Sequence, residues 1–302
     1  MLPFERVSII GLGLIGSSIA RAVRETMPTV RLTGHDASAE VRETVRVLKL
    51  CDDVADSAGT AVTDADLVIL CVPVGAMGEV AAALAADVPS DAIISDVGSS
   101  KAGVSEALAN ALPDNIIVPA HPVAGTERSG PEAGFAALFH QRWCILTPAP
   151  DTPEAAVARV SAFWERLGSN VEVMDPAHHD LVLAITSHLP HLIAYTIVGT
   201  ASDLESVTQS EVIKYSAGGF RDFTRIAASD PVMWRDVFLT NKDAVLEMLQ
   251  RFSEDLTALQ RAIRWGDGDA LLDLFTRTRA VRRSIIEQGQ DDARPDFGRG
   301  DH

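Results

Sequence analysis

The sequence Val7-Ser-Ile-Ile-Gly-Leu-Gly-Leu-Ile-Gly16 decides the fold of this 302-residue chain. Its apolar start predicts a strand over Val7–Ile10, and the glycines predict a tight turn that leads into a helix. With this spacing the first glycine permits the turn, the second lets the backbone approach a pyrophosphate, and the third allows the helix to pack closely on the sheet. The stretch therefore predicts the first βαβ unit of a dinucleotide-binding domain.

An acidic residue follows the glycines at the distance that such a site requires. Asp36 lies about 20 residues beyond Gly16, at the end of the second expected strand, where its carboxylate can bind the ribose hydroxyls of NAD and repel the 2′-phosphate of NADP. The alternative is that the glycines form only a turn and that Asp36 caps the next helix. Arg42 is near enough in sequence to weaken the preference for NAD. We expect NAD as the cofactor, bound by Gly11, Gly13, Leu14, Ile15, Gly16, Asp36, Val72 and Pro73.

Short β-rich runs alternate with alanine-rich helical segments in the first half of the chain. The continuous apolar run Leu67–Val72 suits a strand buried on both faces, as in a parallel sheet covered by helices. The alternation predicts the α/β class, with a Rossmann-type doubly wound sheet over residues 1–174. The expected strands are Val7–Ile10, Val30–Gly34, Leu67–Val72, Ile93–Asp96, Ile116–Pro119, Cys144–Thr147 and Val171–Val173.

The second half of the chain has helical periodicity instead. Residues 175–288 are expected to form an all-helical substrate and dimerisation domain, and the polar segment 289–302 a flexible tail. The stretch Trp234–Trp265 repeats apolar residues at intervals of three and four, and Gly266 marks a break before a last helix. Because this stretch is too long and apolar to be covered by its few neighbouring helices, we expect a homodimer.

Charge and composition restrict the partners. Lys and Arg number 26 against 42 Asp and Glu, a net charge of −16 that repels phosphate backbones and anionic membranes, so no nucleic-acid or membrane partner is expected. No apolar stretch of about 20 residues was identified that would span a bilayer. The three cysteines are far apart, which fits a reducing cytoplasm and no metal site. An anionic substrate would need a local basic pocket.

Two polar segments follow neighbouring strands and are expected at the same edge of the sheet. They are Asp96–Lys101 and His121–Glu127. His121 is the best candidate for a general base, because histidine titrates near neutral pH, although a lone histidine is more often structural. The pair His178-His179 is interpreted as solvated at a helix start. Trp234 is interpreted as a core residue, with a place in the lining of the site as the alternative. His188 and His191 make only a weak metal site, because Pro190 lies between them and no acid or cysteine adjoins them.

The motifs taken together resemble the prephenate/arogenate (cyclohexadienyl) dehydrogenase family of tyrosine biosynthesis. The resemblance implies a Rossmann domain followed by a helical dimerisation domain. It also implies NAD-dependent oxidative decarboxylation of prephenate to 4-hydroxyphenylpyruvate, and of arogenate to tyrosine. The segments that carry it run in order from about Val7 to about Asn241: Gly11–Gly16, Asp96–Ser99, His121–Glu127, Ser187–His191, Gly219–Ala227 and Asp230–Trp234.

The resemblance also implies roles for individual residues. His121 matches the histidine that takes the proton of the ring 4-hydroxyl, and Ser99 matches the serine that orients this hydroxyl. Arg225 matches the arginine that pairs with the ring carboxylate, and its apolar neighbours predict a partly buried anion site. The positions expected to face the side chain of the substrate are Ser187 and His191, with Thr126 and Glu127 nearby.

Other functions remain open from the sequence. One is an arogenate-specific enzyme, and another is a β-hydroxyacid dehydrogenase or imine reductase, whose helical domain usually supplies a lysine or another acid; Lys214 and Lys242 are the candidates here. A non-catalytic NAD sensor would keep the glycines and Asp36 without needing His121, Ser99 and Arg225 together. The sequence does not decide the preference between the two substrates, tyrosine inhibition, the strictness for NAD or the role of the tail.

Overall fold

The computed structural model describes residues 2–126, 128–208, 214 and 217–287. The expected tail 289–302 lies outside these residues. The chain divides into two compact units, Met1–Leu246 and Glu247–His302. The domain boundary predicted at residue 174/175 lies inside the first unit and stays a prediction.

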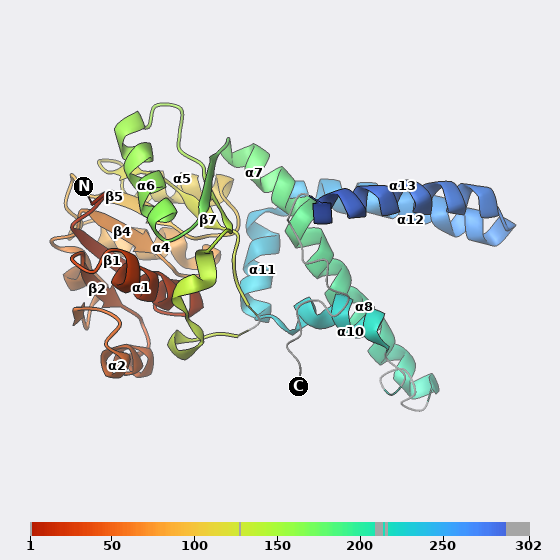
Figure 1. Cartoon of the computed structure of the whole chain (residues 1–302), viewed down its shortest axis with the longest axis horizontal. Helices are drawn as coiled ribbons and strands as arrows, with labels where there is room; N and C mark the ends of the chain where they lie inside the picture. The colour runs from red at the N-terminus through yellow and green to blue at the C-terminus, as the bar shows by residue number, and fades with distance from the viewer. Residues whose placement is uncertain (1, 127, 209–213, 215–216, 288–302) are drawn as a thin grey trace. The chain divides into compact units, whose positions relative to one another are not determined.

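The centre of the first unit is a six-stranded parallel sheet of the predicted doubly wound type (Figure 1). Its strand order is β3-β2-β1-β4-β5-β6. The chain adds β2 and β3 on one side of β1 and then β4, β5 and β6 on the other, and ligands of such folds bind where the side changes, beyond the carboxyl ends of β1 and β4. The strands are β1 (Arg6–Ile10), β2 (Arg31–His35), β3 (Asp53–Val54), β4 (Leu67–Leu70), β5 (Ile93–Asp96) and β6 (Ile116–Ile117).

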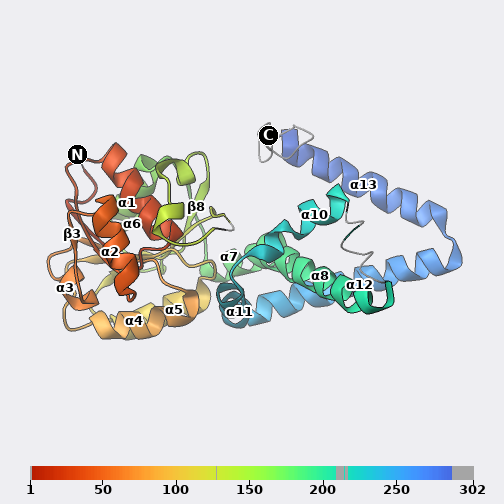
Figure 2. The same ribbon diagram turned by 90° about the horizontal axis from the view of Figure 1, so that it is seen from below.

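Helices cover both faces of this sheet (Figure 2), which explains why its strands read as continuous apolar runs. One core joins β1 and β2 to α1 (Leu14–Thr26) and α6 (Glu154–Arg166), and α2 (Ala39–Leu48) adds Val45. The other core joins β4 and β5 to α3 (Ala58–Val62), α4 (Met77–Leu84) and α5 (Ala102–Ala111). Short 3₁₀ turns complete the unit: η1 (Val74–Ala76), η2 (Pro131–Ala133) and η3 (Ala136–Phe139).

A second, three-stranded sheet follows. Its strands are β7 (Ala120–Pro122), β8 (Trp143–Leu146) and β9 (Asn170–Val173), with β7 antiparallel and β9 parallel to β8. The last two predicted strands therefore belong to a separate sheet. Strand β7 places His121 opposite Ile145, buried beside the end of β5.

The rest of the described chain is helical, as predicted. A continuous run begins at Asp175, whose carboxylate accepts from the backbone N–H groups of Ala177 and His178 and so caps the helix. The predicted single stretch Trp234–Trp265 is two helices that meet at Asn241, and this correction matters because Asn241 is buried next to the site. The elements are α7 (Pro176–Leu183), the π-helical turn η4 (Ala184–His188), α8 (Leu189–Thr208), α10 (Gly218–Thr224), η5 (Arg225–Ala228), α11 (Pro231–Thr240), α12 (Lys242–Trp265) and α13 (Gly268–Glu287).

The helical run Pro176–Leu204 corrects one statement from the sequence. It is long and apolar enough to cross a membrane by length and composition alone, so the statement that no apolar stretch reaches about 20 residues is wrong. Only 28% of its most apolar window is buried within the chain. A helix that covers a second copy of the chain has the same composition, and the absence of a membrane partner stays a prediction.

Candidate active site

The glycine loop has the geometry that a dinucleotide needs. Gly11 has φ +97°, and a Cβ there would collide with the carbonyl oxygen of Cys71. A Cβ at Gly16 would collide with the carbonyl oxygen of Gly11, so the third glycine lets α1 pack against the loop. By contrast, no protein atom lies within 4 Å of a Cβ at Gly13, which is the N-cap of α1. The open space is therefore at the glycine that lets a pyrophosphate approach the helix N-terminus, and the loop fits NAD.

Asp36 is held against this loop. Its carboxylate accepts hydrogen bonds from the backbone N–H groups of Leu12, at 2.8 Å, and Ser38, at 2.9 Å. Arg42 donates to the backbone carbonyl of Asp36, and its guanidinium also lies 3.6 Å from Asp56. Asp36 thus sits at the end of β2 as predicted, and Arg42 is engaged with a carbonyl and a carboxylate.

The end of β4 completes this edge of the sheet. The side chain of Val72 lies beside Gly11, and Pro73 leads into η1. Burial raises the pKa of the neighbouring Cys71 thiol, so this cysteine is held in its protonated, unreactive form.

Beyond β5, a fully buried ion pair supports the loop that carries Ser99. The ammonium of Lys101 donates to the carboxylate of Asp96 and to the carbonyl oxygen of Ala120, at 2.8 Å for the second contact. Asp96 also accepts from the backbone N–H of Gly98, at 2.7 Å. These bonds tie the end of β5 to the start of β7, where His121 lies.

His121 is the first member of a buried chain of three side chains. Its Nδ1 lies 2.8 Å from Nε2 of His179, and Nδ1 of His179 lies 2.9 Å from a carboxylate oxygen of Asp180. Asp180 also accepts from the backbone N–H groups of Lys101 and Ala102, which begin α5, and thereby docks α7 there. The prediction that His179 is solvated is wrong, because its side chain is completely buried, whereas His178 is exposed.

The surroundings of His121 favour its neutral form. Burial lowers its pKa well below the ordinary value, and the positive charges that His179, Lys101 and His188 can carry lower it further. A neutral imidazole at neutral pH is the state in which histidine accepts a proton.

The π-helical turn η4 sets the positions of the next histidines. Pro190 has no N–H to continue the helical hydrogen bonding, and the widened turn lies just before it. His188 is buried and receives a hydrogen bond from the side-chain amide of Asn241 at 3.0 Å, and burial lowers its pKa to about 4.

His191 lies one helical turn further on, at the half-buried end of this group. Its Nδ1 lies 2.9 Å from the carbonyl oxygen of Ser187, and its ring stacks on Trp234 with centroids 3.6 Å apart. Trp234 is a core residue, as predicted, but it also fixes the plane of His191.

Arg225 lies close enough to His191 to affect it. The pKa of His191 is lowered, mainly by burial. The hydrogen bond to the Ser187 carbonyl raises it, and the charge of Arg225 lowers it further. The side chain of Arg225 is exposed in the single chain, so the prediction of a partly buried anion site is wrong for one copy alone. The guanidinium of Arg225 is nevertheless a cation near the half-buried imidazole of His191, the kind of local basic group that an anionic substrate would need.

The remaining predicted residues are less closely tied to this cluster. Ser99 is half-buried, and its backbone lies near His188. Thr126 is exposed, and its hydroxyl accepts from the backbone N–H of Arg128, at 3.2 Å. Glu127 lies outside the described residues.

His179, Asp180 and Asn241 belong to this cluster but were not predicted from the sequence. One signal was available: His179 is four residues before the apolar Leu183, which puts it on the same face of α7. The burial itself depends on the contact between α7 and α5, which no local pattern reveals.

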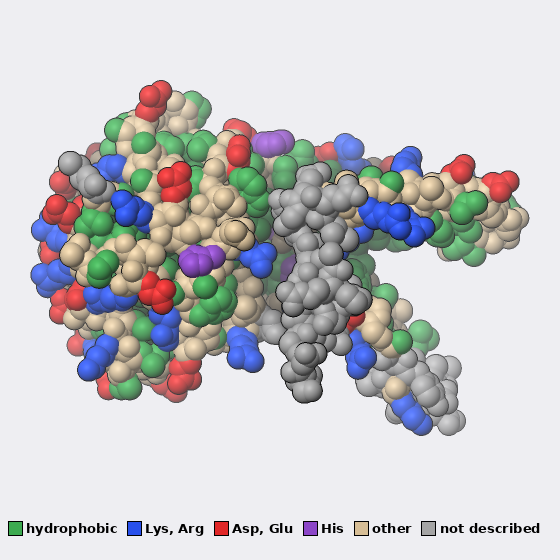
Figure 3. All heavy atoms as spheres, in the orientation of Figure 1, with side chains coloured by type: hydrophobic (Ala, Val, Ile, Leu, Met, Phe, Trp, Pro, Cys, Tyr) green, Lys and Arg blue, Asp and Glu red, His purple; other side chains and the backbone are tan. Residues whose placement is uncertain are grey.

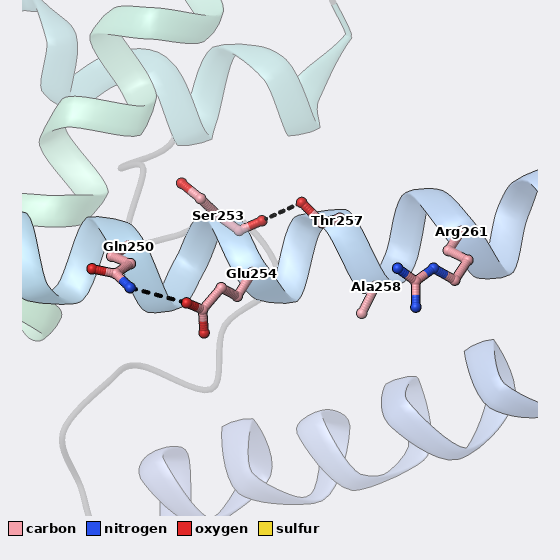
Figure 4. A pocket seen from close by; sticks show the side chains of 6 residues that line it. All are labelled: Gln250, Ser253, Glu254, Thr257, Ala258 and Arg261. Carbon is pink, nitrogen blue, oxygen red and sulfur yellow. Dashed lines mark hydrogen bonds between the residues drawn. The ribbon is translucent and has the colours of Figure 1, made fainter.

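A hollow on another helix and a search for metal-binding groups add no further candidate site among the described residues. A shallow hollow on α12 is lined by Gln250, Ser253, Glu254, Thr257, Ala258 and Arg261, and Figure 4 shows these side chains along one helix. It contains none of the predicted site residues. Among the described residues there is no group of three or more His, Cys, Asp or Glu side chains that could hold a metal ion.

Comparisons with known proteins agree with this arrangement. Two family models match, "Prephenate dehydrogenase, nucleotide-binding domain" over residues 19–173 and "Prephenate dehydrogenase, dimerization domain" over residues 175–277. The chain is 48% identical over 285 residues to the cyclohexadienyl dehydrogenase of Zymomonas mobilis, covering 94% of this chain and 97% of that protein.

Solved structures are similar as well. Prephenate dehydrogenase from A. aeolicus, in complex with hydroxyphenyl propionate and NAD+, has a TM-score of 0.88 and 34% identity, covering 93% of this chain and 98% of that one. Arogenate dehydrogenase from Synechocystis has a TM-score of 0.78 and 25% identity, covering 93% of this chain and 99% of that one.

Proposed function

The chain belongs to the prephenate dehydrogenase family and is an NAD-dependent prephenate/arogenate dehydrogenase of tyrosine biosynthesis, in which we propose that His121 is the general base. The observation that carries this proposal is the burial of His121 beside the end of β5, at the carboxyl edge of the sheet where the glycine loop also lies, in surroundings that lower its pKa. Histidine in its neutral state accepts a proton without the cost of first losing one.

The reaction makes a limited set of demands on the protein. Bound at the glycine loop, NAD would supply the acceptor for the hydride that leaves C4 of the substrate ring. His121 takes the proton of the 4-hydroxyl as that oxygen becomes a carbonyl. The electron pair released when the bond to the ring carboxylate breaks then moves through the ring to this carbonyl oxygen, so CO2 leaves and a phenolate forms. The phenolate takes back the proton held by His121 and becomes a phenol. Because aromatisation drives the last step, the residues mainly have to align the substrate and hold its charges.

We assign the charges of the substrate to the second group of residues. Arg225 binds the ring carboxylate, and His191 and Ser187 face the side chain of the substrate. This assignment is supported by the influence of Arg225 on the pKa of His191. Ser99 orients the 4-hydroxyl in this proposal, and Thr126 lies nearby; Glu127 is outside the described residues.

The cofactor contacts are assigned on the same basis. The backbone around Gly13 and the start of α1 would hold the pyrophosphate, and Asp36 would bind the adenosine ribose of NAD. The contacts of Arg42 with the Asp36 carbonyl and with Asp56 support a preference for NAD over NADP. The contact residues proposed are Gly11, Gly13, Leu14, Ile15, Gly16, Asp36, Val72 and Pro73.

We further propose that the enzyme acts in the cytoplasm without a nucleic-acid or membrane partner. The net charge of −16 supports this, as do the three free thiols. On the face drawn in Figure 3, acidic and basic side chains are interspersed over the sheet-containing part of the described chain rather than gathered into one basic surface.

The finer proposal concerns substrate choice. Both substrates carry a carboxylate in the side chain, and they differ beside it: prephenate has a ketone, whereas arogenate has a cationic amine. Nδ1 of His191 donates to the Ser187 carbonyl, so the protonated ring can donate from Nε2 to the ketone of prephenate but not to the amine of arogenate. We therefore propose that prephenate is turned over efficiently and arogenate at least detectably.

The test is kcat/KM for both substrates with NAD, in wild type and in His191→Ala. The variant should lose more for prephenate than for arogenate, by about 1–3 kcal/mol for one charge-assisted contact. If wild type ignores prephenate, or the variant loses both substrates equally, the proposed role of His191 is wrong.

A further inference from the structure

We propose that Asp180 and His179 are positioning residues that fix His121 in one tautomer, with Nδ1 carrying the hydrogen and Nε2 free to take the substrate proton. The inference rests on the proposed role of His121 as the general base. It adds two residues to the site, neither of which would touch the substrate.

The direction of the hydrogen bonds follows from the end of the chain. An ionised carboxylate can only accept, so Nδ1 of His179 must carry the hydrogen that it shares with Asp180 at 2.9 Å. Neutral His179 then has a lone pair on Nε2, and the 2.8 Å contact requires Nδ1 of His121 to be the donor. The free lone pair of His121 is therefore on Nε2.

Asp180 is held ionised by its other partners. Burial alone would raise its pKa, but hydrogen bonds from His179 and from the backbone N–H groups of Ala102 and Lys101 lower it below the ordinary value. The side-chain amide of Asn241 donates to the backbone carbonyl of Asp180 at 2.8 Å and fixes the helix at this point. The carboxylate is thus held by the first residues of α5 and by His179, and the backbone of Asp180 by Asn241, which makes Asp180 a rigid end for the chain.

The charge of Asp180 also matters when His121 becomes protonated. Titratable groups of several elements surround His121 in the described chain. They are the pair Lys101 and Asp96, His179 and Asp180 from α7, His188 from η4 and the neutral thiol of Cys144 from β8. Lys101 is paired with Asp96, so Asp180 is the carboxylate that reaches the imidazolium, through His179. Removing that carboxylate makes the histidine pair harder to protonate.

A purely structural reading of the same contacts is that they dock α7 on the first residues of α5 and on strand β7 of the second sheet. The two readings differ in what a substitution changes. Loss of docking lowers stability and impairs NAD and substrate binding together, whereas loss of the tautomer lowers kcat and leaves binding intact.

The first experiment compares His179→Leu with His179→Gln, in the prephenate assay with saturating NAD. Leucine removes both hydrogen bonds, and we expect kcat to fall about a hundredfold with KM within about threefold. Glutamine carries a donor and an acceptor about as far apart as the two ring nitrogens, so it can bridge Asp180 and His121, and we expect it to restore kcat to within about tenfold of wild type. His178→Leu is the matched control, because His178 is the exposed neighbour on the same helix, and its kcat should not change.

The second experiment is the pH profile of kcat for Asp180→Asn. Without the carboxylate, the acid side of the profile should move to lower pH by about one unit, because the protonated histidine pair has lost its counter-charge. A structural role would lower activity without moving this limb.

The outcomes separate the inference from the proposed function. If His121→Ala is inactive while His179→Leu keeps kcat within about twofold of wild type, the positioning role of His179 and Asp180 is wrong and the assignment of His121 as the base stands. An equal loss of kcat in His179→Leu and His179→Gln also overturns the positioning role, as does an acid limb of the kcat profile that does not move in Asp180→Asn. If His121→Ala itself is active, the proposed base is wrong.

Discussion

Arg225 carries one positive charge, and the molecule as a whole has a net charge of −16. Its nearness to His191 lowers the pKa of that imidazole, so the two groups share one region of positive potential. A carboxylate bound there would be attracted against the unfavourable field of the whole protein.

Arg225→Ala should therefore raise KM for prephenate with a smaller effect on kcat. A carboxylate clamp contributes about 2–5 kcal/mol when its partner would otherwise be left unpaired, and it holds the substrate and the transition state alike. Steady-state kinetics together with NAD titration checks this. A loss of NAD affinity instead would put Arg225 at the cofactor.

We propose that a second single residue, Asp36, sets the choice between NAD and NADP. A carboxylate beside the 2′-phosphate of NADP costs a few kcal/mol, so kcat/KM should favour NAD by about a hundredfold or more. Asp36→Asn should reduce this ratio by improving the use of NADP. Equal use of both cofactors by wild type would contradict the assignment of Asp36.

At the scale of elements, different glycines of the loop serve the stability of the fold and the binding of the cofactor. A Cβ at Gly11 meets the Cys71 carbonyl and a positive φ, whereas a Cβ at Gly13 meets no protein atom within 4 Å. Gly11→Ala should therefore lower the free energy of unfolding by about 1–3 kcal/mol.

Gly13→Ala should leave the urea unfolding midpoint of the unliganded enzyme nearly unchanged and weaken NAD binding by about tenfold or more, because its methyl group enters the space left for the pyrophosphate. A Gly13→Ala variant with normal NAD affinity would show that the cofactor does not approach the loop here.

The elements also show how far the sequence could predict this fold. Strands β1, β4 and β5 were predictable because they are apolar runs buried on both faces. Strand β7 is three residues, including His121 and Pro122, too short for any periodicity, so its separate sheet was not recognised. His121, Asp36 and the glycines were found from motifs at strand ends. His179 and Asp180 were missed because their burial comes from α7 docking on the first residues of α5.

At the scale of the whole molecule, the exposed apolar surface of the helical part indicates assembly. The unit Glu247–His302 exposes Leu256, Ile263, Trp265, Leu272, Phe275 and Val281, and the dimerization-domain model matches residues 175–277.

We expect a dimer at micromolar concentration in sedimentation velocity. Ile263→Glu should weaken it, since a charge in an apolar interface is costly. The surface substitution Glu254→Gln on the same helix serves as a control. A wild-type monomer under these conditions would contradict dimerisation through the helical part.

The most direct test of the account is the pH profile of kcat for wild type and His121→Ala, with prephenate and NAD. Burial lowers the pKa of His121, so wild-type kcat should stay level down to a pH below about 6.5 and fall as the imidazole is protonated. His121→Ala should lower kcat by about a hundredfold to ten-thousandfold, with little change in KM and without that acid limb. A variant with near-normal kcat and the wild-type pH profile would show that the proton goes to another group and would contradict the site proposed for this enzyme.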